Sequence, residues 1–228
     1  MRGVAFDLRA DLAHFRRPDT TATQMTYPFI SPTAAKGLVG AILGISDFVT
    51  ADKVGIELLR PVRTVTQQMS MLGKDGGTTF SRPTTIELVV QPHYRIYYTG
   101  EQHTEQLIDF LEQGRSVFGT YLGVAYALAR PVLHRCYNAV SYYIGREAAI
   151  ETTSVVPTAL VQKLELRATN QFSRAGGFML EYLGERSFGQ TVDFLFDRGQ
   201  QPVCFVPRPA DKIDVRIAKF DERYVCLV

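Results

Sequence analysis

Basic and hydroxyl side chains crowd one stretch near the start of the chain, FRRPDTTATQMTYPF (residues 15–29). An arginine guanidinium donates paired hydrogen bonds to phosphate oxygens, so the adjacent Arg16 and Arg17 favour contact with a phosphate. A predicted helix follows, with Lys36 in its first turn. The same stretch carries four hydroxyl side chains: Thr20, Thr21, Thr23 and Thr26.

Further basic side chains flank loops that are rich in glycine. They are Arg60 and Arg63 before a predicted hairpin, Lys74 at its tip, Arg82 on its return strand and Arg115 at the start of a second loop. Glycine lets backbone N–H groups approach an oxyanion, which shifts these clusters towards phosphate contact. The net charge is only +2, so any polyanion site must be a local cluster rather than a property of the whole surface.

The sequence lacks the common catalytic and cofactor signatures. It has no GxxxxGK[ST], GxSxG or HExxH motif and no GxGxxG after a strand, so no motif supports a small-molecule enzyme. The histidines (His14, His93, His103 and His134) are scattered, and none has a metal-ligand partner at i+2 or i+4. We therefore predict neither a cofactor nor a metal. One catalytic alternative stays open: His14, which is near basic residues, could act as a general base on an RNA 2′-hydroxyl.

The composition is that of a folded, soluble protein. Hydrophobic residues make up 46% of the 228 residues, which is enough for a packed core. Cys136, Cys204 and Cys226 lie far apart and form no CxxC pair, so we expect reduced, packed thiols. The charged N-terminus is not typical of a signal peptide, and no apolar run is long enough for a membrane span. These features predict a cytoplasmic protein with no membrane partner.

Hydrophobic periodicity predicts alternating strands and helices in the first half. Residues 4–12 alternate as a half-buried strand, and Ser31 with the following proline predicts the start of a helix that Gly44 ends. Inside this helix, Gly37 and Gly40 fit either tight packing on a sheet or close approach of a ligand backbone.

A long hairpin is predicted between the next two strands. Residues 53–66 resemble a strand, and the polar, glycine-bearing segment 63–85 predicts a protruding β-hairpin. Its return strand, a short amphipathic helix ending at Gly114 and a further strand follow. This order is β-α-β-β-α-β, the ferredoxin-like order, with the hairpin between the central strands.

Beyond about residue 133 the pattern is mostly β. We predict strands near residues 137–144, 161–168, 178–183, 191–196, 202–206 and 213–218, and a hairpin turn in RAGGFMLEY (174–182). The predicted fold class is therefore α+β. It comprises a ferredoxin-like domain with a long hairpin over residues 1–135 and a small β-rich C-terminal subdomain over residues 136–228.

Two motifs in the first part of the chain are specific enough to compare with known families. The shorter one is the Tyr121-Leu122-Gly123 step. The longer one comprises Phe15, Pro18, Ser31, Pro32, Ala34, Gly37, Leu38, Gly40, Ala41, Ile42, Leu43 and Gly44. Together they resemble CRISPR-associated protein family five, of the RAMP superfamily, whose fold is ferredoxin-like (RRM/RAMP). The resemblance covers about the first 135 residues, and the remainder in outline.

The resemblance implies a non-catalytic subunit at the foot of a type I CRISPR Cascade complex, most like the type I-B or a related branch. It would cap the 5′ handle of the guide RNA, with the hairpin as a thumb. Its partners would be the guide RNA, a backbone subunit, the large subunit and target DNA near the protospacer-adjacent motif. The implied RNA-binding residues are Arg16, Arg17, Thr20, Thr21, Gln24, Lys36, Arg63, Gln67, Gln68, Met69, Lys74, Arg82, Arg115, Gly119 and Tyr121.

A type I-C branch of the same family cuts the precursor RNA with tyrosine, lysine and histidine side chains. The nearest candidates here are Tyr27, Lys36 and His14, although the sequence has no adjacent Lys-His pair. Metal-independent endoribonuclease activity is therefore the alternative function.

Overall fold

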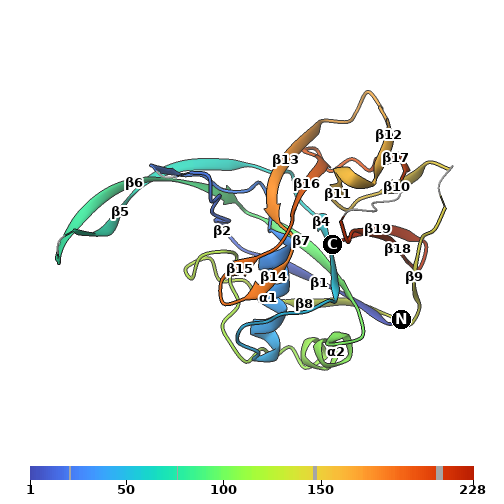
Figure 1. Ribbon diagram of the computed structural model, residues 1–228, viewed down its shortest axis with the longest axis horizontal. Helices are drawn as coiled ribbons and strands as arrows, with labels where there is room; N and C mark the ends of the chain where they lie inside the picture. The colour runs from blue at the N-terminus through green and yellow to red at the C-terminus, as the bar shows by residue number, and fades with distance from the viewer. Residues whose placement is uncertain (21, 76, 146–147, 209–212) are drawn as a thin grey trace.

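The computed structural model describes residues 1–20, 22–75, 77–145, 148–208 and 213–228. Strands dominate these ranges, and helices are few, so the fold is α+β and rich in sheet. Figure 1 shows a body of sheets and helices that carries one long hairpin, which projects away from it. None of the helices in these ranges is long and apolar enough to cross a bilayer.

A four-stranded antiparallel sheet forms the centre of the N-terminal part. α1 and α2 pack against each other, α1 also contacts β4, and α2 also contacts β1 and β8. With the long hairpin and the two short strands before α1 left aside, these elements follow one another as β-α-β-β-α-β. The elements are β1 (Gly3–Arg9), α1 (Pro32–Leu43), β4 (Lys53–Leu58), β7 (His93–Thr99), α2 (Thr104–Glu112) and β8 (Val132–Tyr137), with the strands in the spatial order β4-β7-β1-β8.

Helix α1 begins and ends at the predicted residues. The backbone N–H of Ala34 donates to Ser31 Oγ at 3.1 Å, which caps the first turn. Gly44 follows the last turn with φ of 77°, in the left-handed region that glycine tolerates. A Cβ on Gly40 would lie 2.6 Å from the Phe48 side chain, whereas a Cβ on Gly37 would meet nothing within 4 Å. Close packing thus explains Gly40, and Gly37 faces open space.

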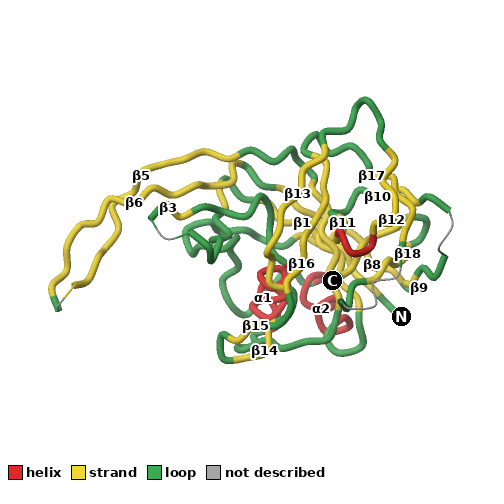
Figure 2. The backbone as a smooth tube through the Cα atoms, turned by 45° about the horizontal axis from the view of Figure 1, so that its top comes forward, coloured by secondary structure: helices red, strands yellow, loops and turns green. Residues whose placement is uncertain are grey.

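The long hairpin consists of β5 (Thr64–Asp75) and β6 (Thr78–Val90), paired from Thr64 opposite Val89 to the tip. Figures 1 and 2 both show it extending away from the other strands. It is longer than the predicted segment 63–85. The predicted strand 53–66 is also divided, because β4 ends at Leu58 and β5 begins at Thr64. Pro61 lies in the break and has no N–H for a ladder.

Two short strands fasten the N-terminal loop to the base of this hairpin. β2 (Leu12–Ala13) pairs antiparallel with β6, and β3 (Thr23–Gln24) pairs parallel with the same strand. The predicted strand 4–12 therefore breaks after β1, since the chain leaves the central sheet to reach β6. The loop that carries Arg16 and Arg17 lies between β2 and β3.

After β8 the chain forms small antiparallel sheets, in the orders β10-β17-β12, β11-β16-β13 and β19-β18-β9, and the β14-β15 hairpin. The sequence missed β10, β11, β15 and β19. The elements are β9 (Val140–Tyr142), β10 (Ile150–Thr152), β11 (Val156–Pro157), η1 (Thr158–Leu160), β12 (Val161–Glu165), β13 (Phe172–Met179), β14 (Tyr182–Gly184), β15 (Ser187–Phe188), β16 (Thr191–Asp197), β17 (Val203–Pro207), β18 (Arg216–Phe220) and β19 (Arg223–Leu227).

The predicted turn in RAGGFMLEY is wrong. The segment belongs mostly to β13, where the register with β16 shifts between Ala175 and Phe178 in a β-bulge. Gly177 adopts φ of 76° there. The chain reverses later, between β14 and β15, where Glu185 and Arg186 have φ of 49° and 59°.

One hydrophobic cluster extends through both predicted parts. Phe29 stacks on Phe178 with ring centroids 4.9 Å apart and meets Phe194 edge-on at 5.7 Å. The residue after β19 also joins β4, since Val54 and Val228 exchange backbone hydrogen bonds of 3.0 and 2.9 Å. The core therefore crosses the predicted boundary at residue 135, and the division into two domains stays a prediction.

Candidate nucleic-acid interface

The loop between β2 and β3 carries Arg16 and Arg17, and we call it the arginine loop. Backbone and threonine hydrogen bonds hold it in a narrow, closed shape. The N–H of Tyr27 donates to the Phe15 carbonyl at 2.8 Å, and that of Arg17 to the Met25 carbonyl at 2.9 Å. The buried Thr26 hydroxyl accepts from the Phe15 N–H at 2.8 Å. Because these bonds pair the two arms of the loop, Arg16 and Arg17 project from a supported backbone.

The two arginines line different pockets. Arg17 lines a pocket of about 280 Å³ between the loop, the base of the long hairpin and the β13 bulge, here called the arginine pocket. Arg174 and Arg198, from the C-terminal half, line it too. Its other lining residues are Thr26, Tyr27, Pro28, Val62, Thr64, Glu87, Ser173, Ala175, Gly176 and Phe196.

Carboxylates already hold two of these three guanidinium groups. Arg17 donates to both oxygens of Asp19, at 3.1 and 2.7 Å, and the bond to Asp19 raises the pKa of Arg17. Arg174 pairs with Asp193, which also accepts the Gly177 N–H at 2.9 Å. Arg198 is exposed and makes no ion pair with any residue in the described ranges. The Asp193 carboxylate shows that an oxyanion fits between a guanidinium and the bulge backbone.

Tyr27 separates the arginine pocket from a second pocket. Its ring stacks on Phe178 with centroids 4.2 Å apart, and its hydroxyl donates to the Gly177 carbonyl at 2.5 Å. Burial raises the pKa of Tyr27, so the phenol stays protonated at neutral pH. The Tyr27 side chain, held by these two contacts, therefore forms the boundary between the two pockets.

The second pocket, of about 390 Å³, is mostly apolar and is lined by His14, Phe15, Arg16, Tyr27 and Gly123, among others. His14 is only 4% exposed. Its Nδ1 lies 2.8 Å from the Glu87 carbonyl oxygen, and because a carbonyl only accepts, Nδ1 carries a proton. Nε2 is buried and has no hydrogen-bond partner among the described residues.

The structure separates Lys36 from the other two candidate catalytic residues. His14 and Tyr27 line one pocket, but Lys36 lines neither of the two pockets. Its side chain is 8% exposed, and burial together with the charge of Lys53 lowers the pKa of Lys36 to about 8. The three residues of the nuclease alternative thus do not form one constellation.

The remaining predicted RNA-binding residues lie in three places. Thr20 and Gln24 lie in the arginine loop region, where Thr20 Oγ1 donates to the Arg17 carbonyl at 3.1 Å, and Thr21 lies outside the described residues. Arg115 packs over the Phe110 ring at 4.3 Å, far along the chain in the α2–β8 loop. That loop also holds Gly119 and Tyr121, while Arg63, Gln67, Gln68, Met69, Lys74 and Arg82 lie just before or along the long hairpin.

Sequence reasoning missed Arg174 and Arg198. Arg198 stands beside a glycine, in DRG, and Arg174 lies two residues before one, in RAGG, a signal of the kind that marked the N-terminal clusters. Their convergence with Arg17 depends on β13 and β16 packing beside the arginine loop, which no local pattern reveals. No group of three or more His, Cys, Asp or Glu side chains in the described part of the chain could hold a metal ion.

Solved structures with a similar fold come from CRISPR systems. A chain of a CRISPR RNA-guided surveillance complex aligns at 12% identity and a TM-score of 0.56, covering 90% of this chain and 91% of that one. A CRISPR protein from Archaeoglobus fulgidus aligns at 13% identity and a TM-score of 0.58, covering 99% and 98%. A chain of the Type III-B Cmr-beta complex bound to cognate target RNA and AMPPnP aligns at 10% identity and a TM-score of 0.50, covering 88% and 86%. At these identities the likeness is one of fold.

The family described as CRISPR-associated protein (Cas_Cas5) matches residues 3–162. This match spans more than half of the chain, so the protein belongs to that family, and the resemblance drawn from the sequence is confirmed. No curated protein matches the chain.

Proposed function

We propose that the protein is a non-catalytic subunit of a type I CRISPR Cascade complex and binds the 5′ handle of the guide RNA. One observation carries this proposal: Arg17, Arg174 and Arg198 come from distant segments and line one pocket at the base of the long hairpin. Arg16 lies next to it, on the other side of Tyr27. Guanidinium groups that converge from separate elements suit the phosphates of a bent single strand.

The long hairpin supports the assembly part of the proposal. Its outer half exposes apolar side chains, with Leu72 73% and Phe80 46% exposed. We assign it the role of a thumb on a ferredoxin-like RAMP domain, which packs on a neighbouring backbone subunit. The C-terminal sheets would face the large subunit and target DNA near the protospacer-adjacent motif, and the type I-B branch stays a prediction.

Three features favour binding over cleavage. The Nε2 atom of His14, which a general base would use, is buried. The Tyr27 hydroxyl is occupied by the Gly177 carbonyl. Lys36 lies outside the pocket that these two residues share.

Incubation of the purified protein with labelled CRISPR repeat RNA in EDTA tests the proposal. We expect intact RNA on a denaturing gel and a shifted band on a native gel, and the shift should weaken in Arg16→Ala/Arg17→Ala. Arg135→Ala/Arg208→Ala, which removes the same charge away from both pockets, should bind as the wild type does. Cleavage at one position, lost in His14→Ala or Tyr27→Phe, would establish the endoribonuclease instead.

A further inference from the structure

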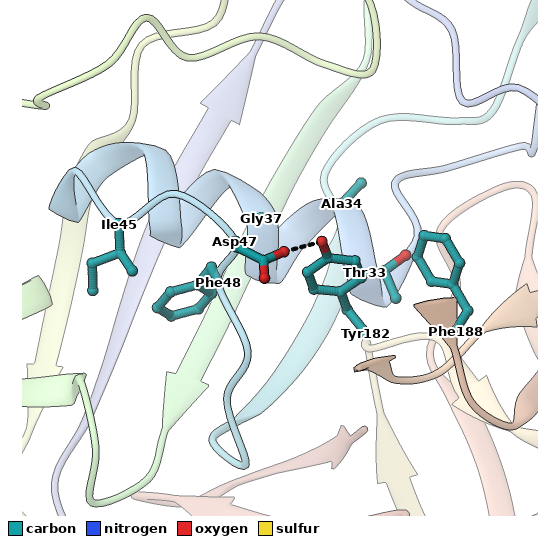
Figure 3. A pocket seen from close by; sticks show the side chains of 8 residues that line it. All are labelled: Thr33, Ala34, Gly37, Ile45, Asp47, Phe48, Tyr182 and Phe188. Atoms are coloured by element: carbon teal, nitrogen blue, oxygen red, sulfur yellow. Dashed lines mark hydrogen bonds between the residues drawn. The ribbon is translucent and has the colours of Figure 1, made fainter. Parts of the chain in front are cut away.

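A third pocket, of about 390 Å³, lies between α1 and the β14-β15 hairpin, and we call it the aromatic cage. Three rings line it, from Phe48, Tyr182 and Phe188, together with the carboxylate of Asp47. Figure 3 shows these side chains around the exposed side of α1, with Gly37 behind them. Neither arginine of the arginine loop lines this pocket.

Two segments far apart in the chain build the cage. Tyr182 donates a short hydrogen bond to Asp47 Oδ1, and the Glu185 N–H donates to the same oxygen at 3.3 Å. Asp47 lies just after α1 and adopts a left-handed backbone conformation, with φ of 54°. Its second oxygen, Oδ2, accepts no hydrogen bond from any residue in the described ranges. The cage thus has one carboxylate oxygen without a hydrogen bond from the described residues, next to Gly184 and on the residue that Tyr182 contacts.

This combination suits a cation. Aromatic faces attract guanidinium and ammonium groups, and a carboxylate adds a charged acceptor for their N–H groups. A nucleotide could stack on the rings, but its phosphate would then lie beside the Asp47 carboxylate, which repels it. The charge of this pocket is therefore opposite to that of the arginine pocket.

The rim of the cage indicates a protein rather than a small cation. Phe188, which lines the cage, is 45% exposed, and Val49, which lies beside Gly184 at the end of β14, is 52% exposed. Exposed apolar side chains around a pocket with one charged group are typical of a site for an anchoring side chain of a partner protein.

The Tyr182 and Phe188 rings contact each other, with centroids 5.4 Å apart, and together form one side of the cage. We propose that the aromatic cage binds an arginine side chain of a partner protein, which lies against these rings with its guanidinium at Asp47 Oδ2. Arginine fits better than lysine, because its planar group stacks on rings while its fork donates to the carboxylate. Arg186 is the basic residue nearest in sequence to the β15 side of the cage, and it makes no ion pair in the described ranges.

The test uses N-acetyl-arginine-amide as the probe and N-acetyl-citrulline-amide as its neutral, nearly isosteric control. Ring signals of the full chain, labelled at Phe and Tyr, are followed by NMR during titration. We expect the arginine probe to shift the signals of Phe48, Tyr182 and Phe188 with saturation, and citrulline to leave them unchanged.

Two variants make the result specific. Asp47→Asn removes the charge but keeps an acceptor for Tyr182 and a residue that tolerates positive φ, so the cage should stay folded. The affinity of this variant for the arginine probe should be about tenfold lower, as expected for the loss of a charge-assisted hydrogen bond. Asp19→Asn, which removes a carboxylate at the arginine pocket, should leave the affinity unchanged, and neither prediction depends on RNA binding.

Three outcomes would overturn the proposal. The first is the absence of ring shifts with the arginine probe. The second is adenosine monophosphate shifting the same rings more strongly than arginine does, which would assign the cage to a nucleotide. The third is arginine binding that appears only in Arg186→Ala, which would show that the chain's own Arg186 fills the cage.

Discussion

The outer half of the long hairpin and the body that carries it differ in what their side chains contact. Along the hairpin, every described residue from Thr64 to Pro83 is exposed or only partly buried, and Leu72 and Phe80 face solvent. In the body, even glycines are in close contact: a Cβ on Gly123 would overlap the His14 carbonyl oxygen. Packing with the core therefore constrains the body, whereas the side chains of the hairpin contact mainly each other, as Phe80 does over Gly73.

The arginine pocket lies where these two regions meet. Thr64 and Glu87 at the base of the hairpin line it, together with Arg174 and Arg198 from the body. A ligand in this pocket would touch both regions at once. The following predictions test this contrast, from the largest expected effect to the smallest.

Gly123→Ala should destabilise the body most. Gly123 has φ of 82° and lies against the His14 backbone, so alanine adds both backbone strain and a clash. We expect a loss of about 3 kcal/mol or more in the free energy of unfolding, measured by urea denaturation. Gly119→Ala, in the same loop but with nothing within 4 Å, should stay close to the wild type. Equal effects of the two substitutions would contradict tight packing at Gly123.

Lys36→Met should stabilise the body at neutral pH. Burial lowers the folded-state pKa of Lys36 to about 8 from 10.5, so the unfolded chain binds more protons between these values. The penalty for the buried charge is therefore full below pH 8, at about 3 kcal/mol, and falls as the pH rises towards 10.5.

Unfolding experiments at pH 7 and pH 10 measure this difference. At pH 7 the free energy of unfolding of Lys36→Met should exceed that of the wild type by up to the full penalty. This difference between the two proteins should shrink at pH 10. Lys219→Met, which removes a partly exposed lysine that pairs with Glu222 at 3.5 Å, is the matched control and should not stabilise the protein at pH 7. A difference that is constant with pH would show that Lys36 does not titrate in this window.

Arg198→Ala should weaken RNA binding without changing stability. Arg198 is exposed, has no carboxylate partner among the described residues and lines the arginine pocket, so its charge is free for a phosphate. We expect about a fivefold loss of affinity for repeat RNA, the size of a single charge-assisted contact. Filter binding measures it, and Arg135→Ala is the control outside the pocket. An unchanged affinity would remove Arg198 from the interface.

Shortening the hairpin should have the smallest effect on the isolated chain. Replacing residues 71–82 with Asn-Gly joins Ser70 to Pro83, a pair that already face each other. Because the removed side chains contribute little to the core, the free energy of unfolding should change by less than about 1 kcal/mol. A larger loss in thermal unfolding would mean that the hairpin belongs to the folding unit of the body.

Local signals in the sequence predicted some features well and others poorly. The caps of α1 at Ser31 and Gly44 and the presence of the hairpin follow from short-range chemistry, and both were predicted. The burial of Lys36 was not, because a lysine in the first turn of a helix is usually solvated and only the fold places it near Lys53. Arg198 was missed for the same reason, since a contact between distant strands leaves no local pattern.

The salt dependence of RNA binding tests the central claim most directly. Affinity for repeat RNA is measured against KCl concentration for the wild type and for Arg17→Ala/Arg174→Ala/Arg198→Ala. If the three arginines contact phosphates, the slope of log K against log salt should become shallower by about 2 units. A weaker affinity with an unchanged slope, or no change in either, would contradict the account and place the guide RNA elsewhere on the protein.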